Sequence, residues 1–491
     1  MPDAASTAAA DEADSPLPAP VLFGDDSQPA WPVRDGARSQ VALAGSSGPI
    51  SGNAFPAALA GLEFLTEAGR RTLDWARRRS IGVTSACGIS LAMAICATAW
   101  FSAGSRTGNI RGVAALWIGY LVALAARKLG RPPEENAGPA GERVAKADQP
   151  VVHGTRTAQP RALRLSGSAG WFAALGACLA ECIVYAGLSV GATAERWSGV
   201  WPLASAVVGL VAVRDLMTAS SSPPGLGDDE KGALHKIAYA VLTMPAGGRV
   251  LLIGVVAPIW GARAALLALL DWAIISIGYG LAGRVAQGLG DASRTLVRLR
   301  DDGVLARSLG RLVKGNLMPL PPAVLGLAAI STLAILGLHG LPGILIIGPA
   351  IIMLLAAPGS SNRHAGRFDW LVPVLLLAAQ YLYLTATGVA ARVPGPVVFA
   401  LCTVLLLRYC DLAFPGRPSV LAGRRPAMSA AERGSGLGWE GRILLAGVAA
   451  AMGIATFAYL ALTLYFGALI CAKVLASCLV PQQEASPRAA R

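Results

Sequence analysis

The residues Gly119-Tyr-Leu-Val-Ala-Leu-Ala-Ala-Arg127 close an apolar run that begins near Val113. The run is close to the length of a membrane-spanning helix, and it ends in a basic residue. Apolar helices of this kind cross a bilayer, and a basic end favours the cytoplasmic side. We therefore expect an α-helical membrane protein, with Arg127 at the cytoplasmic end of one span.

The composition of the whole chain agrees with this interpretation. Of its 491 residues, 54% are hydrophobic and 14% are charged. A soluble protein with a large core does not contain so many unbroken runs of about 20 apolar residues. The net charge of +13 does not indicate nucleic acid binding, because the basic residues gather in alternate loops, which is a signal of membrane topology. We expect no nucleic acid partner.

The apolar runs predict an all-α, polytopic fold with about eleven membrane spans. A turn at 258–263 reverses the chain between the fifth span and the sixth. The last run has about 33 residues, more than the roughly 20 that cross a bilayer. One tilted helix is its simplest interpretation, and a re-entrant hairpin broken at Gly467 is the alternative. The expected spans are residues 82–102, 113–126, 170–190, 201–216, 248–258, a sixth that ends near 283, 321–338, 341–357, 369–388, 394–407 and 443–475.

The basic loops predict the orientation of the chain. Lys and Arg are concentrated in the loops that are cytoplasmic when the N-terminus is inside, including the linker 128–164. An odd number of spans then places the C-terminus outside. Residues 1–68 are rich in Ala, Ser, Pro, Asp and Gly without periodicity, so we expect a disordered N-terminal tail there. A polar tail is expected at 479–491.

Two groups of spans are separated by an amphipathic stretch. We expect a six-span domain at 69–284, a cytoplasmic linker helix within 285–318 and a second transmembrane domain at 319–478. In the linker, basic and apolar side chains fall on opposite helical faces, which is typical of a helix that lies in the bilayer surface. A connector packed on the protein is the alternative. The two faces are Arg307, Arg311 and Lys314 against Leu305, Leu309, Leu312 and Val313.

The residues Ala126 and Arg127 match the end of the motif D-x-x-D-G-x-x-A-R. This motif is typical of CDP-alcohol phosphatidyltransferases, six-span enzymes whose second motif is G-x-x-x-D-x-x-x-D, and the first half of the chain resembles this family. The resemblance implies carboxylates that hold a divalent metal against a pyrophosphate. In this chain other residues occupy the acid positions of both motifs and the glycine position of the first: Gly119, Val122, Ala123, Ala173 and Ala177.

A wider resemblance covers most of the chain, from about 77 to 475. In this range the chain is similar to an uncharacterised actinobacterial membrane family, in which a CDP-alcohol phosphatidyltransferase-like half precedes a second hydrophobic domain. The matching markers are Phe368-Asp-Trp-Leu-Val-Pro373, Leu407-Arg-Tyr-Cys-Asp411 and Trp439-Glu-Gly-Arg442. The resemblance implies a multi-pass protein of the bacterial cytoplasmic membrane.

Ionisable residues inside or beside membrane spans are candidates for functional sites. Glu181 is the candidate catalytic residue, because it lies one turn beyond Ala177 on the face of the missing acids. Its alternative role is a packing carboxylate paired with a basic residue such as Arg127 or Arg214. The candidate substrate-binding residues are Arg127, Glu181, Arg214, Asp369, Asp411 and Arg442, with Glu440 beside the last. No metal site is expected, since the four histidines are scattered.

A second match to D-G-x-x-A-R occurs at Asp302, Gly303, Ala306 and Arg307. This segment is polar, and no second acid motif follows it. A short motif outside its structural context carries little weight. We interpret this match as a product of chance.

Three functions are compatible with these features. The favoured one is a non-catalytic protein that binds membrane lipid or a partner, either an active membrane enzyme or a second copy of itself. The first alternative is an active transferase in phospholipid or lipid-linked headgroup synthesis, and only this alternative requires Mg²⁺ or Mn²⁺. The second alternative is a carrier for lipid or solute. No other cofactor is expected.

Overall fold

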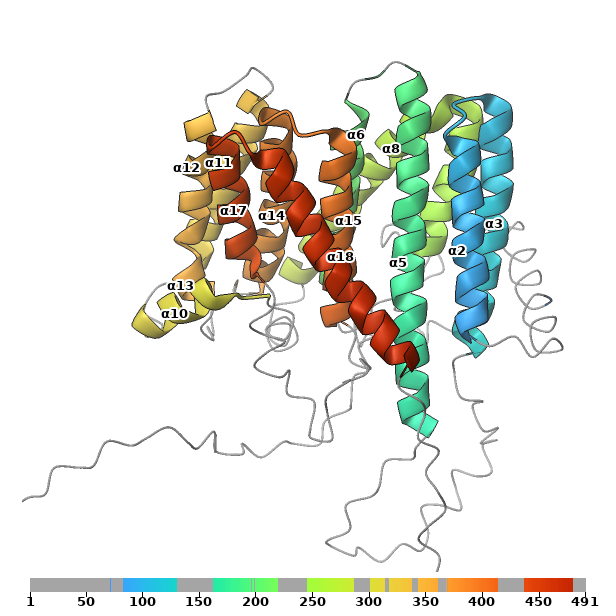
Figure 1. Ribbon diagram of the computed structural model, residues 1–491, viewed down its shortest axis with the longest axis horizontal. Coiled ribbons are helices and arrows are strands. Elements are labelled where there is room, and N and C mark those ends of the chain that lie inside the picture. Colours follow the sequence, from blue (N-terminus) through green and yellow to red (C-terminus); the bar gives the residue numbers. More distant parts are fainter. Residues whose placement is uncertain are drawn as a thin grey trace, which may run out of the picture. The chain divides into compact units, whose positions relative to one another are not determined.

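The computed structural model describes residues 71, 83–129, 162–195, 197, 199–219, 245–286, 301–313, 318–337, 343–360, 368, 370–413 and 437–479. The predicted tail at 1–68 lies outside these residues, and so does the predicted tail at 479–491 except for Leu479. Most of the linker 128–164, Asp369, Lys314 and the side chain of Arg127 also lie outside them. Within them the regular elements are helices (Figure 1): α2 (Val83–Phe101), α3 (Arg106–Leu129), α5 (Ala162–Ala194), α6 (Val200–Ala219), α8 (Ala246–Ala286), α10 (Val304–Val313), α11 (Leu320–Gly337), α12 (Gly343–Leu354), α13 (Ala357–Ser360), α14 (Leu371–Ala390), α15 (Gly395–Ala413), α17 (Trp439–Ala451) and α18 (Ala455–Leu479).

The all-α membrane fold predicted from the sequence is confirmed. In the part that the structure describes, seven helical segments are long and apolar enough to cross a membrane. Three shorter apolar helices accompany them, at Ser85–Phe101, Leu320–Ile335 and Leu345–Ser360. The total of about eleven spans remains a prediction. The seven segments are Arg106–Leu124, Trp171–Ala194, Val200–Met217, Ala246–Arg284, Leu371–Ala390, Gly395–Leu412 and Ala455–Ser477.

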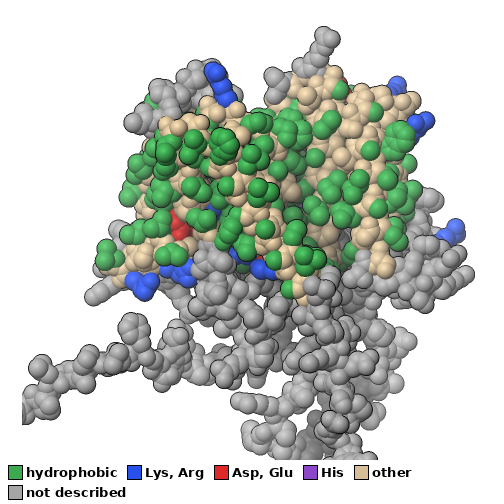
Figure 2. All heavy atoms as spheres, in the orientation of Figure 1, with side chains coloured by type: hydrophobic (Ala, Val, Ile, Leu, Met, Phe, Trp, Pro, Cys, Tyr) green, Lys and Arg blue, Asp and Glu red, His purple; other side chains and the backbone are tan. Residues whose placement is uncertain are grey.

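The surface of the helices is apolar, as a lipid-facing surface must be. Trp260, Phe457 and Leu464 are among the large apolar side chains that are mostly exposed. Figure 2 shows apolar side chains across the face of the helices in view, with Lys and Arg side chains toward the helix ends. A soluble protein rarely exposes so much contiguous apolar surface. This distribution places hydrocarbon around the middle of the helices and headgroups at their ends.

The predicted chain reversal between the fifth and sixth spans is confirmed. Helix α8 contains Pro258, and Gly261 has a φ of 90° that interrupts the helix. A Cβ atom on Gly248 would lie 3.0 Å from Trp272 Cη2, although these residues are 24 positions apart. A straight helix would separate them by about 36 Å. The two legs of α8 therefore run antiparallel.

The last apolar run is not one tilted helix, and that prediction is wrong. It forms α17 and α18, which are separated at Gly453, where φ is 74°. The Gly453 N–H donates to the Ala450 carbonyl, and the Ile454 N–H donates to the Ala449 carbonyl. These two bonds form a Schellman motif, which ends a helix at a left-handed glycine. Gly467, the predicted break, lies within α18 instead.

The two predicted transmembrane domains share one hydrophobic core. Helices α14 and α15 both pack against α6, and α15 also packs against α5. Glycines allow close contact at two points, where Gly209 approaches Tyr381 and Gly395 approaches Trp201. The Trp201 and Phe399 rings meet edge to face, with 5.7 Å between their centroids. The second half is therefore fixed directly on the first.

Helix α10 lies across the ends of other helices, and it is shorter than the predicted linker. It packs on α13 and α17 through small residues, among them the buried Gly303 and Ala306. Its apolar face stays outside, with Leu312 80% exposed and Val304 63% exposed. The helix thus combines the two predicted arrangements, since one face packs on the protein and the leucine face is open. Contact of that face with lipid remains a prediction.

Candidate functional site

The motif positions of the first half converge on one cavity of about 440 Å³. Helices α2, α3, α5 and α8 form its walls. Gly119, Ala123 and Ala177, which stand where the family motifs have other residues, line it together with Glu181. Val122 and Ala173 are absent from the lining. The full lining is Ser90, Ala94, Leu116, Gly119, Tyr120, Ala123, Ala177, Ala180, Glu181, Ala246 and Val250.

The glycine at the first acid position allows two helices to approach closely. A Cβ atom on Gly119 would lie 3.0 Å from Met93 Cβ and 3.3 Å from the Ser90 carbonyl oxygen. These distances are tighter than ordinary van der Waals contact. An aspartate at this position would therefore require α2 and α3 to move apart.

Glu181 belongs to a chain of ion pairs that joins three helices. The Arg249 guanidinium of α8 lies 2.9 Å from the Glu181 carboxylate of α5, and 3.6 Å from the Asp215 carboxylate of α6. Arg214 binds Asp215 at 2.7 Å. Two cations and two anions therefore balance within the cluster. The partner of Glu181 is Arg249, which the sequence analysis did not select.

The cavity does not fit a divalent metal ion. Magnesium and manganese prefer several oxygen ligands, and carboxylates supply most of the charge in protein sites. Glu181 is the carboxylate that lines this cavity, and its charge is already balanced by Arg249. Among the described residues, no group of three or more His, Cys, Asp or Glu side chains is placed to hold a metal ion.

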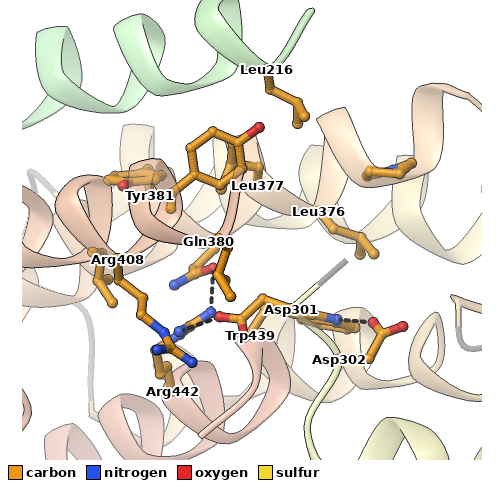
Figure 3. A pocket seen from close by; sticks show the side chains of 14 residues that line it. Leu216, Asp301, Asp302, Leu376, Leu377, Gln380, Tyr381, Arg408, Trp439 and Arg442 are labelled. Atoms are coloured by element: carbon orange, nitrogen blue, oxygen red, sulfur yellow. Dashed lines mark hydrogen bonds and ion pairs between the residues drawn. The ribbon is translucent and has the colours of Figure 1, made fainter. Parts of the chain in front are cut away.

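A second cavity, of about 560 Å³, lies between the two halves of the fold. Helices α6, α14, α15 and α17 form it, together with the residues that precede α10. Figure 3 shows the side chains of Arg408, Gln380 and Arg442 directed toward the same part of it. The full lining is Leu216, Asp301, Asp302, Pro373, Leu376, Leu377, Gln380, Tyr381, Leu405, Arg408, Tyr409, Leu412, Trp439 and Arg442.

The predicted site residue Arg442 lines this second cavity and is held firmly in place. Its guanidinium lies 2.7 Å from the Asp301 carboxylate and donates to Gln380 Oε1 at 3.3 Å. It also lies over the Phe466 ring, 5.4 Å from the centroid. The Trp439 indole N–H donates to Asp302 Oδ1 at 3.2 Å. These bonds connect α17 to the segment before α10 and to α14.

Asp411, another predicted site residue, is buried beside the cavity and does not line it. Its carboxylate lies 2.7 Å from the Lys473 ammonium of α18 and 3.7 Å from the Arg408 guanidinium. The Trp171 indole of α5 donates to it at 3.3 Å. Asp411 therefore connects α15 to α18 and α5, and its role in the structure is to join helices.

Glu440 and Gly303 join the start of α10 to the start of α17. The Ala306 N–H donates to Glu440 Oε1 at 3.2 Å, which caps the N-terminus of α10. Burial raises the pKa of the Glu440 carboxyl, and backbone hydrogen bonds oppose this shift. Gly303 lies directly against Gly438. The segment that matched D-G-x-x-A-R thus has a structural role at this junction.

The structure does not gather the predicted residues into one site. Glu181 and Arg214 belong to the ion-pair cluster beside the first cavity. Arg442 lines the second cavity, and Asp411 is buried next to that cavity. Sequence reasoning missed Arg249, Asp215 and Arg408, which are charged residues near the ends of apolar helices. Their position beside apolar runs is a signal that could have selected them.

Comparison with known proteins covers the second half of the chain. A model described as "Family of unknown function (DUF5941)" matches residues 290–485. The matched segment contains α10 to α18, and with them Asp301, Arg408 and Arg442. No curated protein and no solved structure matches the chain.

Proposed function

We propose that the chain is a membrane protein that binds a lipid in the first cavity and does not catalyse phosphatidyl transfer. One observation carries this proposal: the cavity at the motif positions is lined by Gly119, Ala123 and Ala177, and its carboxylate, Glu181, is paired with Arg249. In this proposal the first half resembles a CDP-alcohol phosphatidyltransferase without its metal-binding acids. The membrane is the bacterial cytoplasmic membrane, and the N-terminus is inside.

The lining of the cavity supports a lipid as the ligand. Apolar walls from Ala94, Leu116 and Val250 suit hydrocarbon, whereas Ser90 and Tyr120 offer hydroxyl groups to a headgroup. Ligand sites commonly combine mostly apolar walls with a few polar groups that fix orientation. A partner protein, either an active membrane enzyme or a second copy of this chain, would bind the same lipid.

The test uses the full-length protein in nanodiscs. We expect no release of CMP from CDP-diacylglycerol with magnesium or manganese, and a lipid that remains bound through purification and is measured by mass spectrometry. Ala177→Leu fills the cavity and should reduce the bound lipid. Ala472→Leu changes an exposed position of α18 and should leave it unchanged.

Two outcomes would contradict the proposal. Metal-dependent CMP release that disappears in Glu181→Gln would favour the transferase alternative. Equal amounts of bound lipid in the protein and in Ala177→Leu would show that the cavity is not the lipid site. Flux of lipid or solute through the protein in liposomes would instead favour a carrier.

A further inference from the structure

We propose that the second cavity binds a phosphate-bearing anion, with Arg408 as its principal cationic contact. Arg408 is 4% exposed and Arg442 is 3% exposed, so both are buried charges. Their Nε atoms have no hydrogen-bond partner among the residues that the structure describes, and the same holds for the hydroxyls of Tyr381 and Tyr409. All four side chains line the cavity.

The charges around the cavity leave Arg408 as the least compensated cation. Arg442 is matched by Asp301 at 2.7 Å. Asp411 lies 2.7 Å from Lys473, whereas its distance of 3.7 Å from Arg408 exceeds that of an ordinary hydrogen bond. A buried cation is costly unless it is paired and hydrogen-bonded. The neighbouring carboxylates therefore compensate the positive charge of Arg408 only in part, and a bound anion would complete the compensation.

The remaining acidic group of the lining is engaged elsewhere. Asp302 accepts hydrogen bonds from the Trp439 indole and from the Ser360 hydroxyl, at 3.2 Å and 3.4 Å. Figure 3 shows Asp302 on the far side of Trp439 from Arg408 and Arg442. An anion beside the two guanidinium groups would thus be separated from this carboxylate by the indole ring.

The donor set fits a phosphate group. A guanidinium presents its N–H groups as a planar fork that matches phosphate oxygens. Gln380 accepts from Arg442 with Oε1, so its amide nitrogen remains a donor. The hydroxyls of Tyr381 and Tyr409 add two further donors. The charged oxygens of a phosphate group are strong hydrogen-bond acceptors, and each of these groups can donate to them.

The rest of the cavity suits the apolar part of a larger molecule. Its walls include Leu376, Leu377 and Leu405, whose side chains can contact an apolar group next to the phosphate. The two arginines lie near the last turn of α15 and the first turn of α17, at helix ends where lipid headgroups are expected. The phosphate could belong to a lipid headgroup or to a soluble phosphate compound. This site is independent of the first cavity.

The experiment measures binding to the full-length protein in nanodiscs of phosphatidylcholine. One arm adds radiolabelled inorganic phosphate, and the other replaces part of the lipid with phosphatidic acid and follows retention by native mass spectrometry. We expect saturable binding in at least one arm. Binding of phosphatidic acid alone identifies a lipid headgroup, and competition by inorganic phosphate identifies a soluble ligand.

Variants assign the binding to Arg408. Arg408→Gln should weaken binding by about tenfold or more, because it removes the charge and the forked N–H donors of the guanidinium. Arg408→Lys, which keeps the charge, should lose less, and Tyr409→Phe should lose a smaller amount through its hydroxyl alone. Arg311→Gln removes an exposed cation outside the cavity and should bind as the unchanged protein does.

The proposal is overturned if neither probe binds, or if Arg408→Gln, Arg408→Lys and Tyr409→Phe all bind both probes with unchanged affinity. Because Tyr409→Phe keeps every charge, it tests the site even if Arg408→Gln fails to fold. Ala177→Leu should leave phosphate binding unchanged. A failure of the first cavity to bind lipid would therefore not be mistaken for a failure of this site.

Discussion

The carboxylate of Glu181 and the guanidinium of Arg249 lie 2.9 Å apart, although the residues are 68 positions apart in the chain. Their side chains are 20% and 7% exposed, so the pair is largely removed from water. Asp215 and Arg214 extend it across α6. This cluster borders the first cavity, which Glu181 lines.

Removal of one member of this pair should destabilise the protein. Arg249→Gln leaves two carboxylates without their shared cation, and loss of one partner of a buried pair costs about 3–5 kcal/mol. The double variant Glu181→Gln/Arg249→Gln should be more stable than Arg249→Gln. Thermal unfolding in detergent checks the order. Strict additivity of the two single changes would show that the pair contributes no coupling energy.

Alanine at Gly303 should also destabilise the protein, for a steric reason. A Cβ atom there would lie 2.7 Å from the Gly438 nitrogen, and it would also meet the Glu440 carboxylate. Such overpacking costs about 1–3 kcal/mol, and Gly438→Ala should behave in the same way. Gly278→Ala is the control, because among the described residues no atom beyond its own turn of helix lies within 4 Å of its Cβ position. If Gly303→Ala unfolds no earlier than Gly278→Ala, the close contact is not needed.

The fold class could be predicted from the sequence, because the length of each apolar run shows whether a helix of those residues can cross a bilayer. The reversal at Pro258 and Gly261 could also be predicted, because proline and glycine change the backbone conformation at their own positions. The break at Gly453 was missed although a left-handed glycine leaves a sequence signal. Gly467 was named as the alternative break, and it lies within a continuous helix. Several glycines in one apolar run look alike until their backbone angles are known.

The partners within the candidate sites could not be predicted, because they depend on which helices face one another. Glu181 was selected as a candidate catalytic residue and lines the first cavity, but its partner comes from α8. Arg408 lies three residues before Asp411 and was not selected from the sequence. Its place in a cavity follows from the packing of α14, α15 and α17, which a single sequence does not contain.

The stability of the junction at Glu440 should depend on pH. Burial raises the pKa of this carboxyl, so the folded state binds the proton more readily than the unfolded state does. Stability should then fall as the pH rises from the usual carboxyl pKa, about 4.3, through the raised value. Glu440→Gln cannot ionise and should lose this dependence.

The measurement compares the melting temperatures of the two proteins between about pH 4 and pH 8. The advantage of Glu440→Gln should grow as the pH rises. Glu195→Gln, which changes an exposed carboxylate, is the matched control. A constant difference between Glu440→Gln and the unchanged protein over this range would contradict the prediction.

The leucine face of α10 should bind anionic membranes. A peptide of residues 298–316 should become helical and bind vesicles that contain phosphatidylglycerol, because each basic residue adds about 1 kcal/mol near an anionic surface. Salt should weaken this binding. Serine in place of Leu305, Leu309 and Leu312 should abolish it, whereas glutamine in place of Arg307 and Arg311 should weaken its salt dependence. A peptide that stays unbound at low salt would leave α10 as a packed connector only.

The C-terminus should lie on the same side of the membrane as the N-terminus, in contrast to the sequence-based expectation. The chain reverses at Gly453, so α17 and α18 run in opposite directions. Arg442, near the start of α17, lines a cavity with Arg408, and Lys473, near the end of α18, binds Asp411 one turn further along α15. The start of α17 and the end of α18 thus lie at the same end of α15. Two helices that cross in opposite directions bring the chain back to the side on which α17 begins. Reporters fused after Arg143 and after Arg491 should both give a cytoplasmic signal. A periplasmic signal at Arg491 with a cytoplasmic one at Arg143 would show that one of these two helices does not cross.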